Sequence, residues 1–523
     1  MNFKDELKER FKSKITFLSE NKGSLEFPLD LSFPLDSDDT KRFHYFFYQL
    51  KEDLRFHICL DISLIEEEDK FIYYQFLNLD VHFQLQVIVP IGKALFFPTL
   101  VDIWRSSDLL EKEITKKYRV AICDGLKSSQ RKLEKELSIK KDNDLIPDLP
   151  KYEGSLYTNN TEDRKCWYKF GPNEGPFNGK VRVDFLLGEN KVYDSRVVNG
   201  YHFRNFEQLA KNKSLSALPL FFERLCTRDS LFAPLLLIEV LEELLQVDPT
   251  NKAKAMRMVW IELARIESHL YFLWELTHHL GFILESSIFS ELLEHVYNLY
   301  SLYSGKVQNF SVFEVGGLKK ESPLGWGTET LETAKYLLKT LNTVEMGLKR
   351  SPDFMEVTKG FSLSAIKAID FGLTGPNLRA CGVNFDVRKT RPSYFYEDVD
   401  FKVPLGVDGT TYDRFLVRLE ELKQSIRIIN QVLDHLPAGD ISQNYVMEGE
   451  IKNKETFKTV ESSEGLLGLL LKFNDKGEIS HLHLRSPSLA NIGSYPFLVK
   501  GGNLDGSLTA FQSLNIDAWE LDR

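Results

Sequence analysis

The chain has 523 residues, of which 43% are hydrophobic and 12% aromatic, and its formal net charge at pH 7 is −10. Because one hydrophobic core rarely organises more than about 300 residues, we expect two or more domains. The acidic balance offers no basic field that would attract nucleic acid, so a nucleic-acid-binding function is disfavoured.

The N-terminal sequence MNFKDELKERFKSK is charged and lacks the apolar stretch of a secretory signal. No later stretch offers about 18 consecutive uncharged apolar residues, so we expect a soluble or peripheral protein. The five cysteines form no CxxC pair and no paired framework, which is typical of a protein in a reducing cytoplasm.

Residues 1–120 are expected to form a small α/β module. Residues 38–55 have the pattern of a helix, and three runs rich in β-branched and aromatic residues follow at 56–66, 71–79 and 83–91. Three consecutive strands joined by short polar breaks predict an antiparallel meander.

Residues 121–165 form a predicted charged linker. This stretch contains clusters of Lys, Glu, Asn and Pro, a composition that favours exposed chain over a packed core. Strand-like alternation returns at 180–198, so the second domain is expected to run from 166 to 523.

Long helices dominate the second domain. Apolar residues recur with a helical period in 233–245 and 256–284, and the segment after residue 464 alternates like a hairpin around Asp475–Gly477. Further helical patterns lie at 285–303, 324–349 and 411–435. The expected fold class is α+β, with a small α/β module followed by a larger domain that has a central bundle of long helices and peripheral β strands.

The most specific motif is a long series of fixed polar and glycine positions between residues 371 and 431. In order, it contains Thr374-Gly375-Pro376, Leu378-Arg379, Asp386-x-Arg388-Lys389, Pro392, Asp400-Phe401 and Asp413-Arg414. This segment closely resembles the signature block of the quinone-site subunit of respiratory complex I, which is related to the large subunits of energy-converting nickel–iron hydrogenases. The resemblance implies a fold like that of hydrogenase large subunits.

Other segments agree with this resemblance in the same order along the chain. Residues 170–183 are similar to the opening strand–loop–strand of that family, 200–212 to its first helix entry, and 221–230 to the following turn. Upstream, the stretch 98–118, including Trp104, is similar to the subunit usually encoded just before it. The chain therefore resembles a complex I protein in which the C and D subunits are fused.

The resemblance implies a role in electron transfer to a quinone. A protein of this kind docks an iron–sulfur subunit of the complex I B type, and the quinone binds in the cleft between the two. No glycine-rich phosphate loop stands out in the sequence, so NAD(H) and flavin are expected on other subunits. The expected location is the cytoplasmic side of the inner membrane, beside other peripheral-arm and membrane-arm subunits.

The resemblance also implies seven candidate site residues. Arg224 takes the position of an arginine that faces the partner's cluster, where a permanent positive charge would stabilise the reduced cluster. The residues expected to face the same cluster or the quinone cavity are Arg204, Arg265 and His269. The positions expected to serve proton transfer are His202, Thr227 and His279.

At the proton-donating positions the sequence departs from the family. The usual histidine aligns with Phe203, one residue after His202, and the usual tyrosine aligns with Thr227. The acidic partner of that histidine corresponds to His279. A shift of the alignment by one residue would restore His202 but would not restore the tyrosine. Three further family histidines correspond to Glu174, Asn178 and Asn309.

A hydrogenase-type metal site is not expected. Two CxxC pairs hold nickel and iron in hydrogenases, because thiolates suit these metals. The matching positions here are Cys226, Asp229, Asp517 and Glu520. One cysteine of four cannot hold the metal pair, so we predict no self-ligated metal and interpret Cys226 as a small buried hydrophobic residue.

Several charged motifs have a plain structural interpretation beside the functional one. Glu262, Arg265 and His269 share one helix face, where they form either a functional polar network or an internal ion pair with a satisfied core histidine. Two later motifs are most simply buried interface salt bridges, with proton relay as the minority interpretation: Asp386-x-Arg388-Lys389 and Asp413-Arg414.

We therefore expect a peripheral subunit of a membrane-bound NADH:quinone oxidoreductase. Two alternatives stay open at this point. One is a hydrogenase-related, formate-hydrogenlyase-like complex that has lost its metal site. The other is a non-catalytic scaffold in which the fold and the partner surface persist without a working quinone site.

Overall fold

The computed structural model describes most of the chain. The described residues are 3–19, 21–27, 37–66, 70–92, 96–118, 120–123, 165–173, 175–177, 179–226, 228, 230–308, 310–443 and 451–523. They belong to two compact units: unit 1 is Met1–Leu149 with Ile366–Leu373, and unit 2 is Pro150–Ala365 with Thr374–Arg523. The predicted linker lies outside the described residues except at its two ends.

Unit 1 is built on a five-stranded sheet in the order β1-β2-β5-β4-β3. Its strands are β1 (Ile15–Ser19), β2 (Lys22–Glu26), β3 (Ile58–Glu66), β4 (Lys70–Asn78) and β5 (Phe83–Gly92). The predicted meander is confirmed, because β4 pairs antiparallel with both β3 and β5. The sequence analysis missed β1 and β2, and β2 runs parallel to β5.

Helices and two short strands accompany this sheet in unit 1. They are α1 (Phe3–Phe11), α2 (Ser37–Glu52), α3 (Ser107–Tyr118), β6 (Phe96–Pro98) and β7 (Ala121–Cys123). The short helix α12 (Ala365–Asp370) also belongs to unit 1, except for its first residue. In the 98–118 segment, the buried Trp104 indole N–H donates to the carbonyl of Phe56 at 2.9 Å. The Glu111 carboxylate accepts from Thr99 Oγ1 at 2.7 Å, and burial raises the pKa of Glu111 to about 7.

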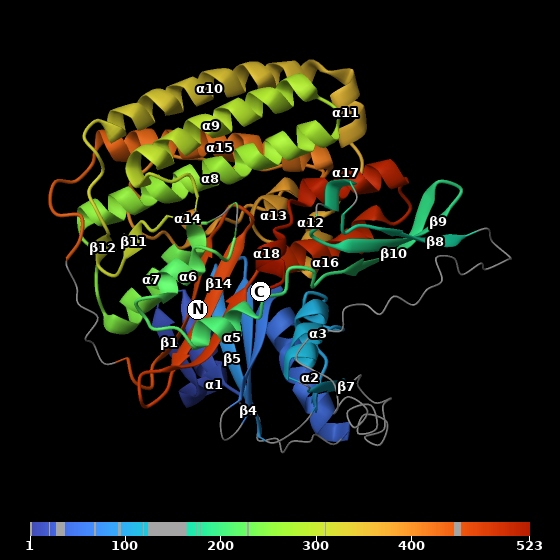
Figure 1. The fold of residues 1–523 in the computed structure, drawn as a ribbon. Coiled ribbons are helices and arrows are strands. Elements are labelled where there is room, and N and C mark those ends of the chain that lie inside the picture. Colours follow the sequence, from blue (N-terminus) through green and yellow to red (C-terminus); the bar gives the residue numbers. More distant parts are fainter. Residues whose placement is uncertain are drawn as a thin grey trace. The chain divides into compact units, whose positions relative to one another are not determined.

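Unit 2 is dominated by long helices. These are α7 (Phe232–Leu245), α8 (Asn251–His279), α9 (Ile283–Ser304), α10 (Trp326–Arg350) and α15 (Thr411–Asp434). Figure 1 shows α8, α9, α10 and α15 packed together as a bundle, in which α8 and α10 each contact both α9 and α15. The predicted helical segments are confirmed, except that the 256–284 pattern is broken at Gly281, whose positive φ of 82° ends α8 before α9 begins.

Short helices and small sheets complete unit 2. The helices are α5 (Phe206–Lys211), α6 (Leu218–Phe222), α11 (Pro352–Thr358), α13 (Gly375–Ala380), α14 (Val387–Thr390), α16 (Pro487–Val499), α17 (Leu504–Leu514) and α18 (Ala518–Leu521). The strands are β8 (Cys166–Phe170), β9 (Arg182–Gly188), β10 (Lys191–Val198), β11 (Phe313–Glu314), β12 (Gly317–Leu318), β13 (Glu455–Glu461), β14 (Leu466–Phe473) and β15 (Ile479–Arg485). The predicted hairpin is confirmed by the antiparallel pair β14 and β15. The mixture of helices and sheets agrees with the expected α+β class.

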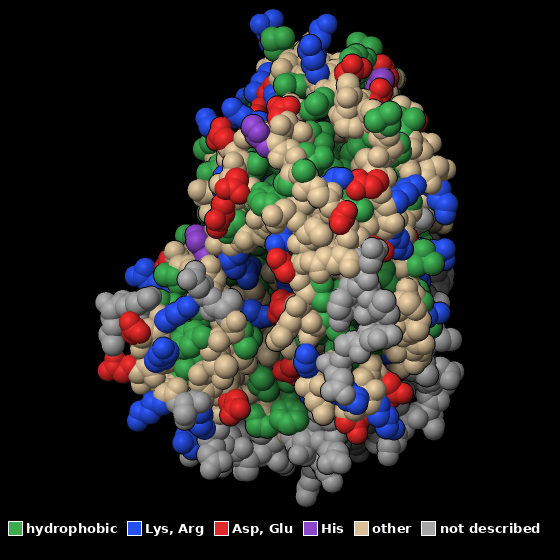
Figure 2. Space-filling view, turned by 90° about the vertical axis from the view of Figure 1, so that its left-hand side faces the viewer, with side chains coloured by type: hydrophobic (Ala, Val, Ile, Leu, Met, Phe, Trp, Pro, Cys, Tyr) green, Lys and Arg blue, Asp and Glu red, His purple; other side chains and the backbone are tan. Residues whose placement is uncertain are grey.

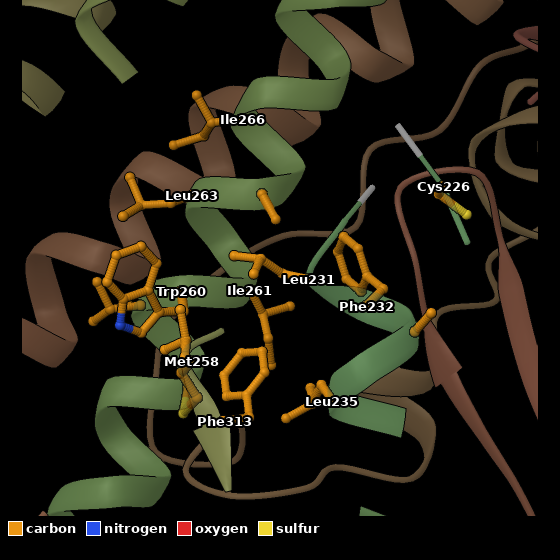
Figure 3. Close-up of a cluster of buried hydrophobic side chains, with 14 of the residues drawn as sticks. Cys226, Leu231, Phe232, Leu235, Met258, Trp260, Ile261, Leu263, Ile266 and Phe313 are labelled. Atoms are coloured by element: carbon orange, nitrogen blue, oxygen red, sulfur yellow. The ribbon is translucent and has the colours of Figure 1, made fainter. Parts of the chain in front are cut away.

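Part of the core of unit 2 lies between α7 and α8. Figure 3 shows Leu231, Phe232 and Leu235 at the start of α7 facing apolar side chains of α8, among them Ile261. Trp260 is fully buried and its ring stacks on Trp326 of α10 with centroids 5.0 Å apart. An apolar helix of this kind has several buried faces, so its charged residues must find partners inside the fold.

A glycine in the signature block allows close backbone approach. Gly375 has φ of +66°, and a Cβ on it would lie 2.4 Å from the Cα of Gly465. Leu466 N–H also donates to Thr374 Oγ1 at 3.0 Å, so the start of α13 is held against the start of β14. The turn at Gly375 therefore brings two backbone segments of unit 2 into close contact.

Gly375→Ala should destabilise unit 2 by about 2–4 kcal/mol, because the added methyl group meets backbone and the left-handed conformation is strained for alanine. Thermal unfolding of the purified chain measures the loss. Gly347→Ala is the matched control, since Gly347 is exposed in α10 and a Cβ there meets nothing within 4 Å. That control should gain about 0.5–1 kcal/mol from helix propensity. Equal effects of the two substitutions would refute the packing argument.

Charged side chains of both signs are scattered over the face drawn in Figure 2. Figure 2 shows Lys and Arg interspersed with Asp and Glu on the described part of one face, with hydrophobic side chains between them. Among the described residues, no helix combines the length and apolarity needed to cross a membrane.

Candidate functional site

Two groups of side chains in unit 2 contain five of the seven candidate residues. We call the first the core ion network, and it comprises Glu262, Arg265, His269, Arg379, Asp386, Arg388, Glu421 and Glu461. We call the second the turn cluster, and it comprises His202, Arg204, Arg224, Cys226 and Trp519. The core ion network is assembled from α8, α13, α14, α15 and β13, whereas the turn cluster joins two turns and α18.

In the core ion network, α8 presents three polar side chains on one face, as predicted from their spacing. Arg265 donates to the carbonyl of Glu461 at 2.7 Å and lies 3.4 Å from the Glu262 carboxylate. His269 Nε2 lies 3.1 Å from Glu421 Oε2 on α15. Arg265 and His269 have no exposed surface, so they contact α8's neighbours inside unit 2.

The signature block supplies the other half of the network. The Arg379 guanidinium donates to Glu421 Oε1 at 2.7 Å and to Glu461 Oε1 at 2.7 Å. Arg388 pairs with Asp386 at 2.7 Å and reaches Glu262 at 3.2 Å. The block therefore folds back onto α8, and its buried salt bridges lie within unit 2. Asp413 instead caps α15, where it accepts from the Thr410 N–H at 3.0 Å.

The charges of this network are set by burial and by close ion pairs. Burial would raise the pKa of Asp386, but the Arg388 and Arg379 cations lower it to about 2. For His269, burial dominates and lowers the pKa to about 4 despite the Glu421 carboxylate. His269 is therefore neutral at pH 7, with its Nδ1 buried and without a hydrogen-bond partner among the described residues.

Because His269 is neutral in the folded protein, we expect the stability of the fold to depend on pH. Between pH 6.5 and about 4, the unfolded imidazole binds a proton that the folded one does not, so stability falls as the pH falls. Over this pH range the free energy of unfolding should fall by about 3 kcal/mol in total. Denaturant unfolding at pH 7.5 and 4.5 should show a smaller pH-dependent loss for His269→Gln than for the unchanged chain. His435→Gln is the exposed control and should keep the original loss; identical losses in all three proteins would contradict the prediction.

In the turn cluster, Arg204 joins two turns and the C-terminal helix. It donates to the carbonyls of Arg224 at 2.9 Å and Leu225 at 3.0 Å, and its guanidinium lies 4.7 Å from the Trp519 ring centroid. The His202 ring lies 4.3 Å from the same indole ring. The backbone N–H of His202 donates to Asp522 at 3.0 Å, which holds the turn to the C-terminal segment.

The structure thus brings His202, Arg204 and Arg224 together. The Arg224 side chain is exposed, His202 and Arg204 are half-buried, and Cys226 is buried as predicted. His279 lies at the end of α8, where its Nε2 is 3.5 Å from Thr509 Oγ1 of α17, and burial lowers its pKa. Several predicted positions lie outside the described residues: Glu174, Asn178, Thr227, Asp229 and Asn309.

Of the three carboxylates at the hydrogenase metal positions, Asp517 and Glu520 have structural partners, and Asp229 lies outside the described residues. Asp517 Oδ1 caps α18 by accepting from the N–H groups of Trp519 at 2.8 Å and Glu520 at 3.1 Å. Glu520 accepts from the Ser486 hydroxyl at 2.5 Å. Within the part of the chain that the structure describes, no group of three or more His, Cys, Asp or Glu side chains is arranged to hold a metal ion. The residues present do not fit a nickel–iron centre.

Sequence reasoning missed one group of charged residues beside the turn cluster. Lys180, Arg228 and Glu275 converge from three separate segments and are largely buried. Glu275 carried a usable signal, because it is an acidic residue in the middle of an apolar helix. Its partners lie 95 and 47 positions away, so spacing along α8 could not reveal them.

Comparison with known proteins decides the family. A family model for the 49 kDa subunit of respiratory-chain NADH dehydrogenase matches residues 281–449. The D subunit of the NADH-quinone oxidoreductase of Carboxydothermus hydrogenoformans is 30% identical over 357 residues, which cover 67% of this chain and 97% of that protein. This chain belongs to the family of that complex I protein.

The similarity of this chain to complex I proteins extends over its N-terminal module. The C/D subunit of the NADH-quinone oxidoreductase of Bdellovibrio bacteriovorus is 27% identical over 522 residues, covering 91% of this chain and 92% of that protein. The predicted resemblance to a fused C/D protein of complex I is therefore confirmed, and the chain is a core subunit of an NADH-quinone oxidoreductase. These relatives do not favour the hydrogenase-related alternative.

A solved structure supports the fold. A chain of an archaeal respiratory membrane complex, the membrane-bound sulfane sulfur reductase, matches with a TM-score of 0.67 and 24% identity. The match covers 70% of this complex I protein and all of that chain. At this identity the likeness shows the fold alone.

Proposed function

We propose that unit 2 forms one wall of a quinone cavity and docks an iron–sulfur subunit of the complex I B type. The observation that carries this proposal is the turn cluster, in which Arg204 ties the turns of His202 and Arg224 to Trp519 of α18. His202 and Arg204 therefore lie in one site, and the exposed Arg224 is next to it. The quinone would accept electrons from the partner's cluster and protons from this site.

Arg224 would face the partner's iron–sulfur cluster. Its side chain is exposed, and the adjacent Glu223 carboxylate is surrounded by Arg224, Lys306 and Lys319. These three cations outnumber the carboxylate on which they act. A positive surface lowers the free energy of the reduced cluster, which carries the extra electron.

His202 would donate a proton to the reduced quinone, together with the positions Thr227 and His279 carried over from the family. Arg204 would hold the His202 turn in place through its two carbonyl contacts. We assign Arg265 and His269 a positioning role, because both are fully buried and fix α8 to β13 and α15.

The same proposal places the chain in its complex. Residues 1–120 would be the C-like module, 121–165 a linker and 166–523 the D-like domain with the layout of hydrogenase large subunits. NAD(H) and flavin would bind to other peripheral-arm subunits, and membrane-arm subunits would hold the assembly at the cytoplasmic side of the inner membrane. Relatives named as NADH-quinone oxidoreductase subunits support this arrangement.

Arg224→Ala in the native complex tests the proposal. We expect quinone reduction to fall about tenfold and the midpoint potential of the adjacent cluster to shift downward, because removing a positive charge disfavours the reduced cluster. Potentiometric titration and a quinone titration with a site inhibitor measure the two effects. Arg350→Ala is the control, since Arg350 is an exposed arginine in the last turn of α10. Unchanged potential and turnover in Arg224→Ala would favour the non-catalytic scaffold.

A further inference from the structure

Three charged side chains form a buried triad next to the turn cluster. Lys180 precedes β9, Arg228 precedes α7 and Glu275 lies on α8. Lys180 Nζ is 3.6 Å from Glu275 Oε2, and Arg228 Nη2 is 3.1 Å from the same carboxylate. The side chains are only 8%, 12% and 8% exposed for Lys180, Arg228 and Glu275, so this is a buried ion cluster rather than a surface pair.

Arg228 and Glu275 are fixed by further contacts. Arg228 Nη1 donates to Asn515 Oδ1 at 3.0 Å, and its guanidinium lies 4.4 Å from the Tyr271 ring centroid. Gln512 Nε2 donates to Glu275 Oε2 at 2.9 Å. Burial would raise the pKa of Glu275, but the Arg228 and Lys180 cations hold it below its usual value. Glu275 is therefore a fixed carboxylate at neutral pH.

Lys180 differs from Arg228 in how easily it can release a proton. Burial first, and then the neighbouring Arg228 cation, lower the pKa of Lys180 to about 8, against the pull of Glu275 and Asp517. A lysine with a pKa near the working pH is suited to general acid catalysis. Its ammonium group has three N–H bonds, and among the described residues Glu275, at 3.6 Å, is its one ion-pair partner.

The triad lies beside the proposed quinone site. A Cβ on Gly179, the residue before Lys180, would lie 3.5 Å from His202 Nε2. Asp517 acts electrostatically on Lys180, Arg228 and Arg204 alike, so all three cations lie within electrostatic range of one carboxylate. The loop that holds Lys180 and the turn that holds His202 are therefore neighbours.

We propose that Lys180 is a proton donor to the bound quinone, with Glu275 and Arg228 as its positioning residues. This inference rests on the proposed function of unit 2. As two electrons arrive from the partner's iron–sulfur cluster, one N–H bond of the Lys180 ammonium breaks and an O–H bond forms on a quinone oxygen. The second proton comes from His202, and the neutral amine and imidazole are reprotonated from water. The quinone is reduced to the quinol and the cluster is oxidised.

Two substitutions separate proton donation from charge. Lys180→Gln removes both the charge and the proton, whereas Lys180→Arg keeps the charge but cannot release a proton at neutral pH. In the purified complex, with a short-chain quinone as substrate, both should lower kcat about a hundredfold and change KM less than about threefold. Lys191→Gln, an exposed lysine on β10, is the control and should match the unchanged complex.

The pH profile supplies an independent readout. In the unchanged complex kcat should decline above about pH 8, where Lys180 loses its proton, and the residual activity of Lys180→Gln should lack that decline. Glu275→Gln should move the decline to lower pH, because the carboxylate no longer stabilises the ammonium. If the complex with Lys180→Gln does not assemble, Glu275→Gln still tests the proposal.

The outcomes distinguish the inference from the function on which it rests. Full kcat in Lys180→Arg or Lys180→Gln, or an unmoved pH profile in Glu275→Gln, overturns the role of Lys180 while quinone reduction by the unchanged complex stands. Absence of inhibitor-sensitive quinone reduction in the unchanged complex overturns the proposed function itself. NADH oxidation with an artificial acceptor that bypasses the quinone confirms that each variant complex is intact.

Discussion

Arg379→Met should destabilise unit 2 by about 3–5 kcal/mol, which is enough to prevent assembly of a marginally stable protein. The Arg379 guanidinium lies 2.7 Å from both Glu421 and Glu461 and 3.7 Å from Asp386. All four side chains are at most 1% exposed, so the substitution leaves three carboxylates buried with too little positive charge. Denaturant unfolding of the isolated chain and recovery of the assembled complex measure the effect.

The control for this prediction lies on the surface of α15. Arg427 pairs with Asp400 at 3.6 Å, and their side chains are 51% and 76% exposed. Solvent screens such a pair, so Arg427→Met should cost less than about 1 kcal/mol. Adding Glu461→Gln to Arg379→Met should recover part of the loss, since it removes one uncompensated charge. Wild-type stability in Arg379→Met would mean that the network is not a structural requirement.

Arg204→Ala should lower quinone reduction about a hundredfold, because the two turns of the site lose their common anchor and small displacements of reacting groups are costly. Arg204→Lys should lower it about tenfold. A lysine keeps the positive charge but cannot donate to two carbonyls and lie flat on the Trp519 ring at the same time. Steady-state kinetics of the purified complex measure both changes.

The matched control for Arg204 is another arginine stacked on a tryptophan. The Arg196 guanidinium lies 4.5 Å from the Trp167 ring centroid, but its side chain is exposed and belongs to β10. Arg196→Ala should therefore keep normal kinetics. Equal turnover in Arg204→Ala and Arg196→Ala would show that the turn cluster has no role in quinone reduction.

The sequence predicted the elements that carry a strong periodic signal. The helices α8, α9, α10 and α15 have long apolar repeats, and the meander β3 to β5 is rich in β-branched and aromatic residues. β1 and β2 were missed because they are only five residues long, and β2 contains Lys22, Gly23 and Ser24. The parallel pairing of β2 with β5 is a long-range contact that local pattern cannot specify.

The site was predicted in part, for a similar reason. Helix spacing correctly placed Glu262, Arg265 and His269 on one face, but their partners come from α14, α15 and β13. The family resemblance identified His202, Arg204 and Arg224 as candidate site residues. It could not reveal Lys180 and Glu275, because their importance depends on an ion pair between residues 95 positions apart in the sequence.

Purification of the native complex through this chain tests the central claim most directly. We predict that an iron–sulfur subunit of the complex I B type co-purifies with membrane-arm subunits, and that the complex reduces quinone in an inhibitor-sensitive manner. Recovery of the chain without an iron–sulfur partner, or in a complex that does not reduce quinone, would contradict the account.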